Sequence, residues 1–258
     1  MISKNTIFLT EVESTNNYAN QLVLSKAAEH GTVVLAQHQN KGKGQQGNSW
    51  ESEAGKNLLS SIILFPNFLF AGKQFYLSKI ASLAIVDFLK TETNGITIKW
   101  PNDIYIQHKK IAGILIENAI KGAYLSSAII GIGLNLNQEI FISEAPNPVS
   151  LKQITRKVYD IELVATTIFE NINNWYQKLE NDGFAEIDSA YFNLLFRANE
   201  WAVYAKNGKQ FEAKIIGIGE FGQLVLEQKN GKISEYMFKE VEFGLNSKMG
   251  INKKRRLE

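Results

Sequence analysis

Residues 96–118 read ITIKWPNDIYIQHKKIAGILIEN, and this stretch decides the centre of the predicted fold. Three apolar runs in it, at 96–100, 104–106 and 111–118, are short enough to be strands. The charged segment His108-Lys109-Lys110 separates the last two runs, as a turn does in a β-hairpin. The stretch therefore predicts strands that follow one another directly in a sheet.

The corner inside this stretch, Lys99-Trp100-Pro101-Asn102-Asp103, has two interpretations. Pro101 ends a strand and Asn102-Asp103 suits a turn, so the corner can be purely structural. A hairpin with a carboxylate at its start and a lysine near its end can also place Asp103 near Lys110. Such a pair could orient the ammonium group or hold a magnesium ion against a phosphate.

Outward from this stretch, helical and strand patterns alternate along the chain. The expected elements are helices at 15–31, 75–89, 162–181 and 185–196 and strands at 32–36, 57–65 and 124–136. From Asn199 the texture changes to short alternating runs joined by Asn207-Gly208 and Asn230-Gly231, which are strong hairpin signals. We expect a mixed domain of helices and strands followed by a separate small all-β unit.

The composition excludes several classes of protein. The 258 residues contain 28 Lys plus Arg, 26 Asp plus Glu and no cysteine, which excludes disulfides, thiolate metal sites and cysteine nucleophiles. Residues 248–258 hold five of the basic residues and one acidic residue, so the remaining body has a net charge of −2, unlike a nucleic-acid-binding domain. The chain has no signal-peptide core and no apolar run near the ~18 residues of a membrane helix, so we expect a soluble cytoplasmic protein.

A polar, glycine-rich stretch at 37–55 cannot build a core and is expected to be a mobile loop. Between Gln39 and Trp50 glycines alternate with lysines, so backbone N–H and ammonium groups can converge on an anion such as a phosphate. The stretch is not a dinucleotide-binding Rossmann fingerprint, because such a fingerprint opens a helix and a strand is expected to follow here. It is not a P-loop either, because the G-K-[S/T] of that motif is missing. An anion-binding flap and an ordinary surface loop both fit the stretch.

Two further segments carry unusual chemistry. Glu13-Ser14-Thr15-Asn16 groups small hydrogen-bonding side chains at a helix start, where an N-cap is the simplest interpretation. The segment from Gly131 to Asn137 has two glycines that let a ligand approach the strand, and Asn135 could face an adenine edge. The histidines lack the spacing of metal ligands, so no zinc site is expected. The sequence contains no G-x-S-x-G motif, so a serine hydrolase is not expected either.

Taken together and in this order, these segments resemble the biotin protein ligase family. The matching segments are Glu13 to Asn16, Gln39 to Trp50, Lys99 to Asp103, Lys110 to Glu117 and Gly131 to Asn135. The resemblance implies an α+β fold, a mixed sheet flanked by helices related to class II aminoacyl-tRNA synthetases, plus a small C-terminal β-barrel. The implied domains are a catalytic biotin- and ATP-binding ligase domain at 1–197, the barrel at 198–245 and a disordered basic tail at 246–258.

The resemblance also implies a reaction and its partners. Biotin and ATP, with magnesium, would give biotinyl-5′-adenylate and pyrophosphate, and a lysine of a biotin carboxyl carrier protein would then attack the adenylate. No specific DNA binding is expected, because Ser14 comes too early for the N-terminal helix-turn-helix that some relatives carry. Relatives include monomers and dimers, so a homodimer is compatible with the resemblance.

The family's site residues transfer to this sequence one by one. Biotin contacts fall on Ser14, Thr15, Asn16, Gln39, Lys43, Gly44, Gln45, Lys110 and Gly113, and adenylate contacts fall on Lys43, Gly44, Gln45, Trp50, Asn102, Lys110 and Asn135. Lys110, Asp103 and Lys43 would be catalytic, with Asp103 also as the magnesium ligand. Lys43 and Gln45 stand where most relatives have arginines, so we expect weaker retention of the adenylate.

Two rival functions share parts of this pattern. A lipoate–protein ligase has the same fold and an adenylation step, but its R-R-x-x-G-G-G-x-V-x-H-D segment is missing here. A non-catalytic biotin or nucleotide sensor would keep the pocket but would need neither Asp103 nor Lys110. Pyrophosphate release from biotin and ATP would distinguish an enzyme from a sensor.

Overall fold

The computed structural model describes residues 1–143 and 147–244. Within it the chain divides into two compact units, Met1–Leu194 and Leu195–Glu258, which we describe separately. The basic tail predicted at 246–258 lies outside the described residues. No helix in the two described ranges is long and apolar enough to cross a membrane.

The first unit is built on a seven-stranded mixed sheet. Its strands are β1 (Thr6–Val12), β2 (Thr32–Gln39), β3 (Leu58–Leu64), β4 (Ile96–Lys99), β5 (Asp103–Ile106), β6 (Lys109–Lys121) and β7 (Tyr124–Leu134). Their order across the sheet is β1-β2-β3-β7-β6-β5-β4. The β1–β2 pair is parallel, and the other neighbouring pairs are antiparallel.

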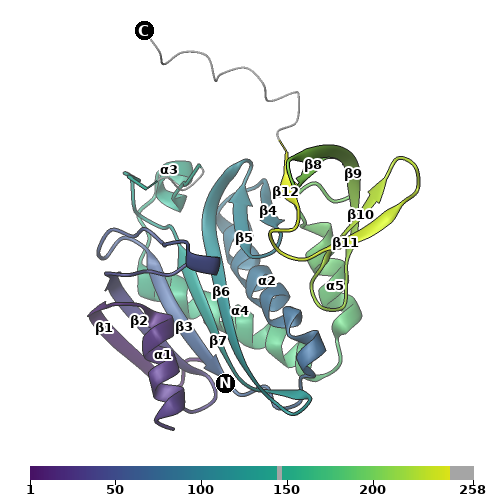
Figure 1. Cartoon of the computed structure of the whole chain (residues 1–258). Coiled ribbons are helices and arrows are strands. Elements are labelled where there is room, and N and C mark those ends of the chain that lie inside the picture. The colour runs from purple at the N-terminus through teal and green to yellow at the C-terminus, as the bar shows by residue number, and fades with distance from the viewer. Residues whose placement is uncertain (144–146, 245–258) are drawn as a thin grey trace. The chain divides into compact units, whose positions relative to one another are not determined.

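Helices cover both faces of this sheet (Figure 1). The helices of this unit are α1 (Thr15–Leu24), α2 (Phe75–Glu92), α3 (Leu151–Thr155), α4 (Ile161–Glu180) and α5 (Phe184–Asn193), with 3-10 turns η1 (Gln45–Gly47) and η2 (Ala71–Lys73). The strands β6 and β7 pass in front of α2 and α4, whereas α1 lies on the near face of the sheet (Figure 1). The predicted mixed sheet with flanking helices is therefore confirmed.

The α1 face of the sheet holds the candidate site. Ala19 of α1 packs on Val34, Ile63 and Ile129, which anchors the helix over β2, β3 and β7. Side chains alternate between the two faces of a strand, so residues two positions along from Ile63 and Ile129 share the α1 face. These residues are Ser61 and Gly131, which pair with each other in the β3–β7 register.

The predicted hairpin within residues 96–118 is confirmed, but its turn is shifted. Lys109 and Lys110 already belong to β6, where they pair with Ile106 and Tyr105 of β5. The turn is Gln107-His108, and Gln107 takes a positive φ of 57° that closes it.

The predicted helix from residue 15 to 31 is wrong at its C-terminal end. The helix stops at Leu24, where the backbone N–H of Ser25 closes the last turn and Lys26 takes a positive φ of 57°. Gly31 instead leads into β2. Its φ is +84°, and an added Cβ would lie 2.7 Å from the carbonyl oxygen of Met1. A glycine is therefore needed here because the backbone of Met1 lies so close, and not because a helix ends.

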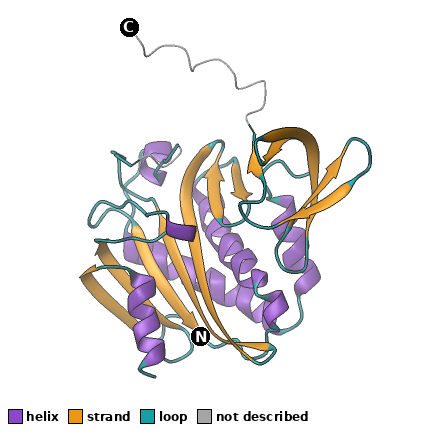
Figure 2. Cartoon of the chain, viewed as in Figure 1, coloured by secondary structure: helices purple, strands orange, loops and turns teal. Residues whose placement is uncertain are grey.

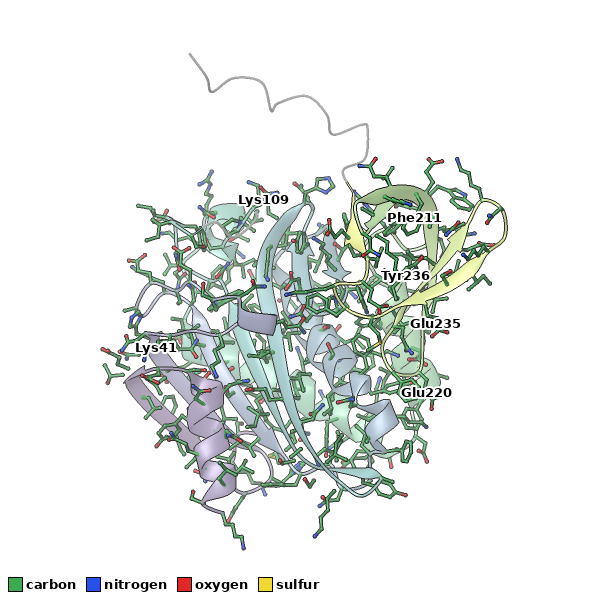
Figure 3. All side chains as sticks on the ribbon, in the orientation of Figure 1. Lys41, Lys109, Phe211, Glu220, Glu235 and Tyr236 are labelled. Atoms are coloured by element: carbon green, nitrogen blue, oxygen red, sulfur yellow. The ribbon has the colours of Figure 1, made fainter. Side chains whose placement is uncertain are left out.

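The second unit is an antiparallel sheet of five short strands. They are β8 (Trp201–Lys206), β9 (Lys209–Ile218), β10 (Leu224–Gln228), β11 (Ile233–Tyr236) and β12 (Glu242–Phe243), in the order β11-β10-β9-β8-β12. Asn207 and Gly208 both have positive φ, as the predicted β8–β9 hairpin turn requires. One aromatic pair on this sheet, Phe211 and Tyr236, stacks with ring centroids 6.0 Å apart (Figure 3).

The predicted closure of this sheet into a barrel is wrong. Within the described residues β11 and β12 are its two edges and do not pair with each other, so the sheet stays open (Figure 2). The β12 strand has two residues. Such a short edge strand supplies too few ladder hydrogen bonds to close a barrel.

Candidate active site

Five polar side chains on the α1 face form a connected chain of hydrogen bonds, which we call the polar relay: Gln39, Thr15, Ser61, Asn16 and Glu117. The backbone N–H of Thr15 donates to Gln39 Oε1 at 2.7 Å, and the Thr15 hydroxyl lies 3.1 Å from the same oxygen. Ser61 Oγ lies 2.8 Å from Thr15 Oγ1 and 2.6 Å from Asn16 Oδ1. Asn16 Nδ2 donates to Glu117 Oε2 at 2.7 Å. The relay thus links α1 to three strands, β2, β3 and β6.

Burial makes the relay a defined structure rather than a set of surface contacts. Thr15, Asn16 and Ser61 are all buried. A buried polar atom costs free energy unless it has a partner, so these side chains are held in place by one another. Ser14, the predicted N-cap, precedes the helix with an extended backbone, but its side chain makes no capping hydrogen bond.

Three glycines on β6 and β7 let side chains lie directly on the sheet surface beside the relay. An added Cβ at Gly131 would lie 2.3 Å from Asn16 Oδ1, so Asn16 requires a glycine there. Gly113 and Gly133 pair with each other in the β6–β7 register. The indole of Trp50 covers both: an added Cβ would lie 2.9 Å from it at Gly113 and 2.4 Å at Gly133.

The predicted loop at 37–55 is partly ordered secondary structure. Its first residues continue β2 as far as Gln39. Further along, the chain folds back on itself: Gly44 N–H donates to Asn48 O at 2.7 Å, Trp50 N–H donates to Gly42 O at 2.9 Å, and Lys43 bridges to Ser49. This tight folding brings Trp50 onto the glycine pair. We call residues 42–50 the flap.

Lys43 of the flap and Lys41 just before it are both bound to residues near the start of α1. Lys43 Nζ donates to Asn17 Oδ1 at 2.6 Å, and Lys41 forms an ion pair with Glu13 at 2.6 Å. The Lys41–Glu13 pair lowers the pKa of the Glu13 carboxyl. Both partners of that pair are largely exposed, and Lys41 lies on the outside of the molecule (Figure 3). Exposed pairs of this kind contribute little stability.

The predicted approach of Asp103 to Lys110 is confirmed. Lys110 Nζ lies 2.6 Å from Asp103 Oδ1, and the two side chains are 24% and 22% exposed. A β-bulge between Ile104 and Tyr105 shifts the β5–β6 register and aligns the pair. Lys110 Nζ is 5.7 Å from the centroid of the Trp50 ring, which connects this pair to the flap. Burial together with the Asp103 charge raises the pKa of the neighbouring Tyr105 to about 12.

Two asparagines of the predicted adenylate site lie at strand ends. Asn102 Nδ2 donates to Ile114 O at 2.6 Å, so this side chain holds the corner before β5. Asn135 is buried and its Nδ2 donates to Val149 O at 3.2 Å. Within the described ranges Asn135 Oδ1, Trp50 Nε1 and Gln45 Oε1 are buried without a hydrogen-bond partner. A bound ligand could complete these groups, each of which otherwise costs about 1–3 kcal/mol.

Three residues of the site region were not found from the sequence. Ser61 lies inside the apolar run of β3, and its one signal was alternation with Ile63, which places it on the α1 face. Glu117 is exposed near the middle of β6 and becomes meaningful only through its distant partner Asn16. Glu51 accepts from the backbone N–H groups of Ile142 and Ser143, both at 2.8 Å, and so ties a second loop to the segment after the flap.

A dedicated magnesium site does not fit these residues. No group of three or more His, Asp or Glu side chains gathers around a metal position in the part of the chain that the structure describes. Asp103, the predicted ligand, is already paired with Lys110. One engaged carboxylate is fewer than a protein-built magnesium cage needs.

Comparison with known proteins defines the class. The model of the biotin/lipoate A/B protein ligase family matches residues 8–135, which contain the relay, the flap and the Lys110–Asp103 pair. The bifunctional ligase/repressor BirA of Bacillus spizizenii is 31% identical over 249 residues, covering 95% of this chain and 75% of that protein. The chain belongs to the biotin/lipoate A/B protein ligase family.

Two further relatives of this chain are biotin ligases by name. The biotin–[acetyl-CoA-carboxylase] ligase of Paracoccus denitrificans is 30% identical over 232 residues, covering 87% of this chain and 95% of that protein. The biotin protein ligase of Aquifex aeolicus, solved in complex with biotin and ATP, has a TM-score of 0.78 and 26% identity, covering 93% of this chain and 100% of that chain.

Proposed function

We propose that this protein is an ATP-dependent biotin–protein ligase that modifies a lysine of a biotin carboxyl carrier protein. The observation that carries the proposal is the half-buried Lys110–Asp103 pair, whose ammonium group lies beside the Trp50 ring that covers Gly113 and Gly133. The relatives support the biotin assignment: those named above are biotin ligases, and no observation favours lipoate. We also propose a cytoplasmic location for this protein, which fits ATP as its co-substrate.

The proposed reaction has two steps. A carboxylate oxygen of biotin attacks the α-phosphorus of ATP, the bond to pyrophosphate breaks, and biotinyl-5′-adenylate forms. The carrier lysine amine then attacks the acyl carbon, AMP leaves with the bonding electron pair, and the amine loses its proton. Both reactants of the first step are anions, so the site must supply positive charge in the transition state. Lys110 supplies it, with Asp103 holding the ammonium group in place.

The remaining roles follow from the resemblance to the biotin protein ligase family. Ser14, Thr15, Asn16 and Gln39 would form the biotin head-group wall, Gly113 would contact biotin beside the Trp50 ring, and Asn102 and Asn135 would face the adenylate. Lys43, Gly44, Gln45 and Trp50 belong to the flap, which would shield the water-sensitive anhydride. Magnesium would enter with ATP and be held by its phosphates, and no step is assigned to a metal on the protein.

Transfer of labelled biotin to a carrier domain, together with pyrophosphate release, tests this proposal. Lys110→Ala should slow adenylate formation on the order of 10²-fold, because one preorganised charge-stabilising group is lost. Lys109→Ala is the matched control: the neighbouring lysine is exposed and lies on the outside of the molecule (Figure 3), and its loss should change the rate by less than about twofold.

Two results would contradict the proposal. A wild-type protein that binds biotin but releases no pyrophosphate would be a sensor. Equal rates for wild type and Lys110→Ala would remove this lysine from the mechanism.

A further inference from the structure

We infer that Lys99 is a second cation of the adenylation site, which binds pyrophosphate as it leaves, and that Tyr105 is the positioning residue that holds it. The inference rests on the proposed function and deepens it, because it concerns the leaving group of the same first step. When the bond to pyrophosphate breaks, its electron pair stays on the departing oxygen, so negative charge grows there. A cation placed where charge develops lowers the barrier.

Lys99 ends a row of paired residues that begins under the flap. Gly133 of β7 pairs with Gly113 of β6, which pairs in turn with Asp103 of β5. The partner of Asp103 on β4 is Lys99. Directly paired residues of neighbouring strands have their side chains on the same face of the sheet. The whole row therefore lies on the face that Trp50 covers at the two glycines, and it runs from β7 toward the β4 edge (Figure 1).

The side chain of Lys99 is held by a neutral group. Its Nζ donates to the Tyr105 hydroxyl at 3.4 Å and lies 5.0 Å from the centroid of the Tyr105 ring. Tyr105 is 6% exposed, so packing fixes its ring. A phenol is uncharged at neutral pH, so this contact orients the ammonium group without cancelling its charge. A hydrogen bond of this length is weak, and a phosphate oxygen can join or replace it.

The two lysines of this face reach β5 from opposite sides. Lys110 of β6 is in register with Tyr105, but its Nζ contacts the Asp103 carboxylate. Lys99 of β4 is in register with Asp103, but its Nζ contacts the Tyr105 hydroxyl. Each lysine thus has its own partner on β5. The four side chains contain two ammonium groups and one carboxylate, so the cluster has a net positive charge.

The geometry of the reaction assigns different parts of ATP to the two lysines. Displacement at phosphorus requires the attacking and leaving oxygens to lie roughly in line, on opposite sides of the phosphorus. The proposed biotin wall lies at α1, β2 and β3, and Lys110 on β6 lies at the α-phosphate of the proposed reaction. Pyrophosphate therefore departs toward β5 and β4. Facing residues of adjacent strands are about 5 Å apart, which places Lys99 about 10 Å beyond β6 on this side.

Separate measurement of the two steps in the full chain tests this role. Lys99→Met removes the charge and keeps the length of the side chain. Adenylate formation from biotin and ATP should slow about tenfold at saturating substrates, and the pyrophosphate concentration that halves this rate should rise about tenfold. Transfer from preformed biotinyl-5′-adenylate to a carrier domain should change less than about twofold, because pyrophosphate takes no part in it. Lys99→Arg keeps the charge and should stay within about threefold of wild type in all three.

Three further variants make the result specific. Lys109→Met is the matched control, because it removes an exposed lysine from the next hairpin strand and should change no step more than about twofold. Lys110→Ala should slow both steps, because the α-phosphate is present in both. Tyr105→Phe keeps the ring and removes the hydroxyl, so it should raise the half-inhibiting pyrophosphate concentration about threefold and leave the transfer step unchanged.

The outcomes separate this inference from the proposed function. A wild type that forms no biotinyl-5′-adenylate overturns the proposed function and this inference with it. With an active wild type, three results for Lys99→Met overturn the role of Lys99 alone: an unchanged response to pyrophosphate, equal slowing of both steps, or a raised KM for ATP at a normal maximal rate. If Lys99→Met does not fold, an unchanged response to pyrophosphate in Tyr105→Phe overturns it.

Discussion

The polar relay and the Lys110–Asp103 pair lie on the same sheet but are built in opposite ways. The relay is mostly neutral, its central side chains are buried, and its only charged member is the exposed Glu117. The other region holds two opposite charges at half-buried positions on one hairpin. Neutral hydrogen-bonding groups recognise the donors and acceptors of a ligand, whereas a charge that is held in position stabilises a transition state.

This contrast suggests a division of labour between binding and chemistry. Changes in the relay should alter the affinity for biotin and leave turnover at saturation nearly unchanged. Changes at the ion pair should do the reverse, because an interaction made in the transition state lowers kcat when it is lost. Substitutions in either region test this division.

Gly131→Ala should damage the relay most. The new Cβ would lie 2.3 Å from Asn16 Oδ1, so the buried asparagine must move and lose its contact with Ser61. We expect a loss of about 2–3 kcal/mol in biotin binding, on the order of 10²-fold in Kd, measured by titration. The kcat at saturating biotin should fall less than about threefold.

Gly217→Ala is the control for the loss of a glycine. Gly217 lies in β9 of the second unit, and an added Cβ there meets nothing within 4 Å. This variant should bind biotin as the wild type does. An unchanged Kd in Gly131→Ala would show that the relay does not position the pocket.

The two regions also differ in how far the sequence could predict them. Asp103 and Lys110 belong to one hairpin, so their spacing was enough to predict their contact, although the bulge that aligns them was not visible. The relay joins residues separated by up to 101 positions, as in the Asn16–Glu117 bond. Alternation with Ile63 assigns Ser61 to a face of β3 but not to a partner, and Glu117 has no local signal, since the roles of both depend on which strands become neighbours.

The fold shows the same limit. Elements with strong periodic patterns, such as α2 and α4, were predicted nearly to their ends. The edge strand β1 was missed because its two faces are both partly exposed, which weakens the alternation. Closure of the small sheet was expected from the resemblance, and it failed because closure depends on pairing between distant edges rather than on any local run.

Asp103→Asn tests the chemical half of the division. The substitution keeps the shape but removes the charge that holds the Lys110 ammonium group 2.6 Å away. A misplaced charge stabilises the transition state less well, so kcat for adenylate formation should fall about tenfold, with the Kd for biotin changed less than about twofold. Pyrophosphate release at saturating substrates measures the first, and titration measures the second. A rise in Kd with normal kcat would reverse the proposed division.

Glu51→Gln should affect neither function and should cost a small amount of stability. Burial alone would raise the pKa of the Glu51 carboxyl, but hydrogen bonds from Ser143, Ile142 and Gln138 outweigh it and lower the pKa below 4.5. A lowered pKa means that the stabilisation is present above about pH 4.5 and is lost as the pH falls through the folded-state value. In glutamine an NH₂ group replaces one of the two carboxylate oxygens, and it cannot accept the hydrogen bond from the backbone N–H that faces it. We expect a loss of about 0.5–1 kcal/mol in the free energy of unfolding at neutral pH, because the contacts are exposed.

Urea titrations at neutral and acidic pH should show the difference from wild type shrinking as the pH falls, whereas Glu53→Gln, an exposed neighbour, should differ at neither pH. A difference that persists in acid would mean that the Glu51 charge does not hold the second loop.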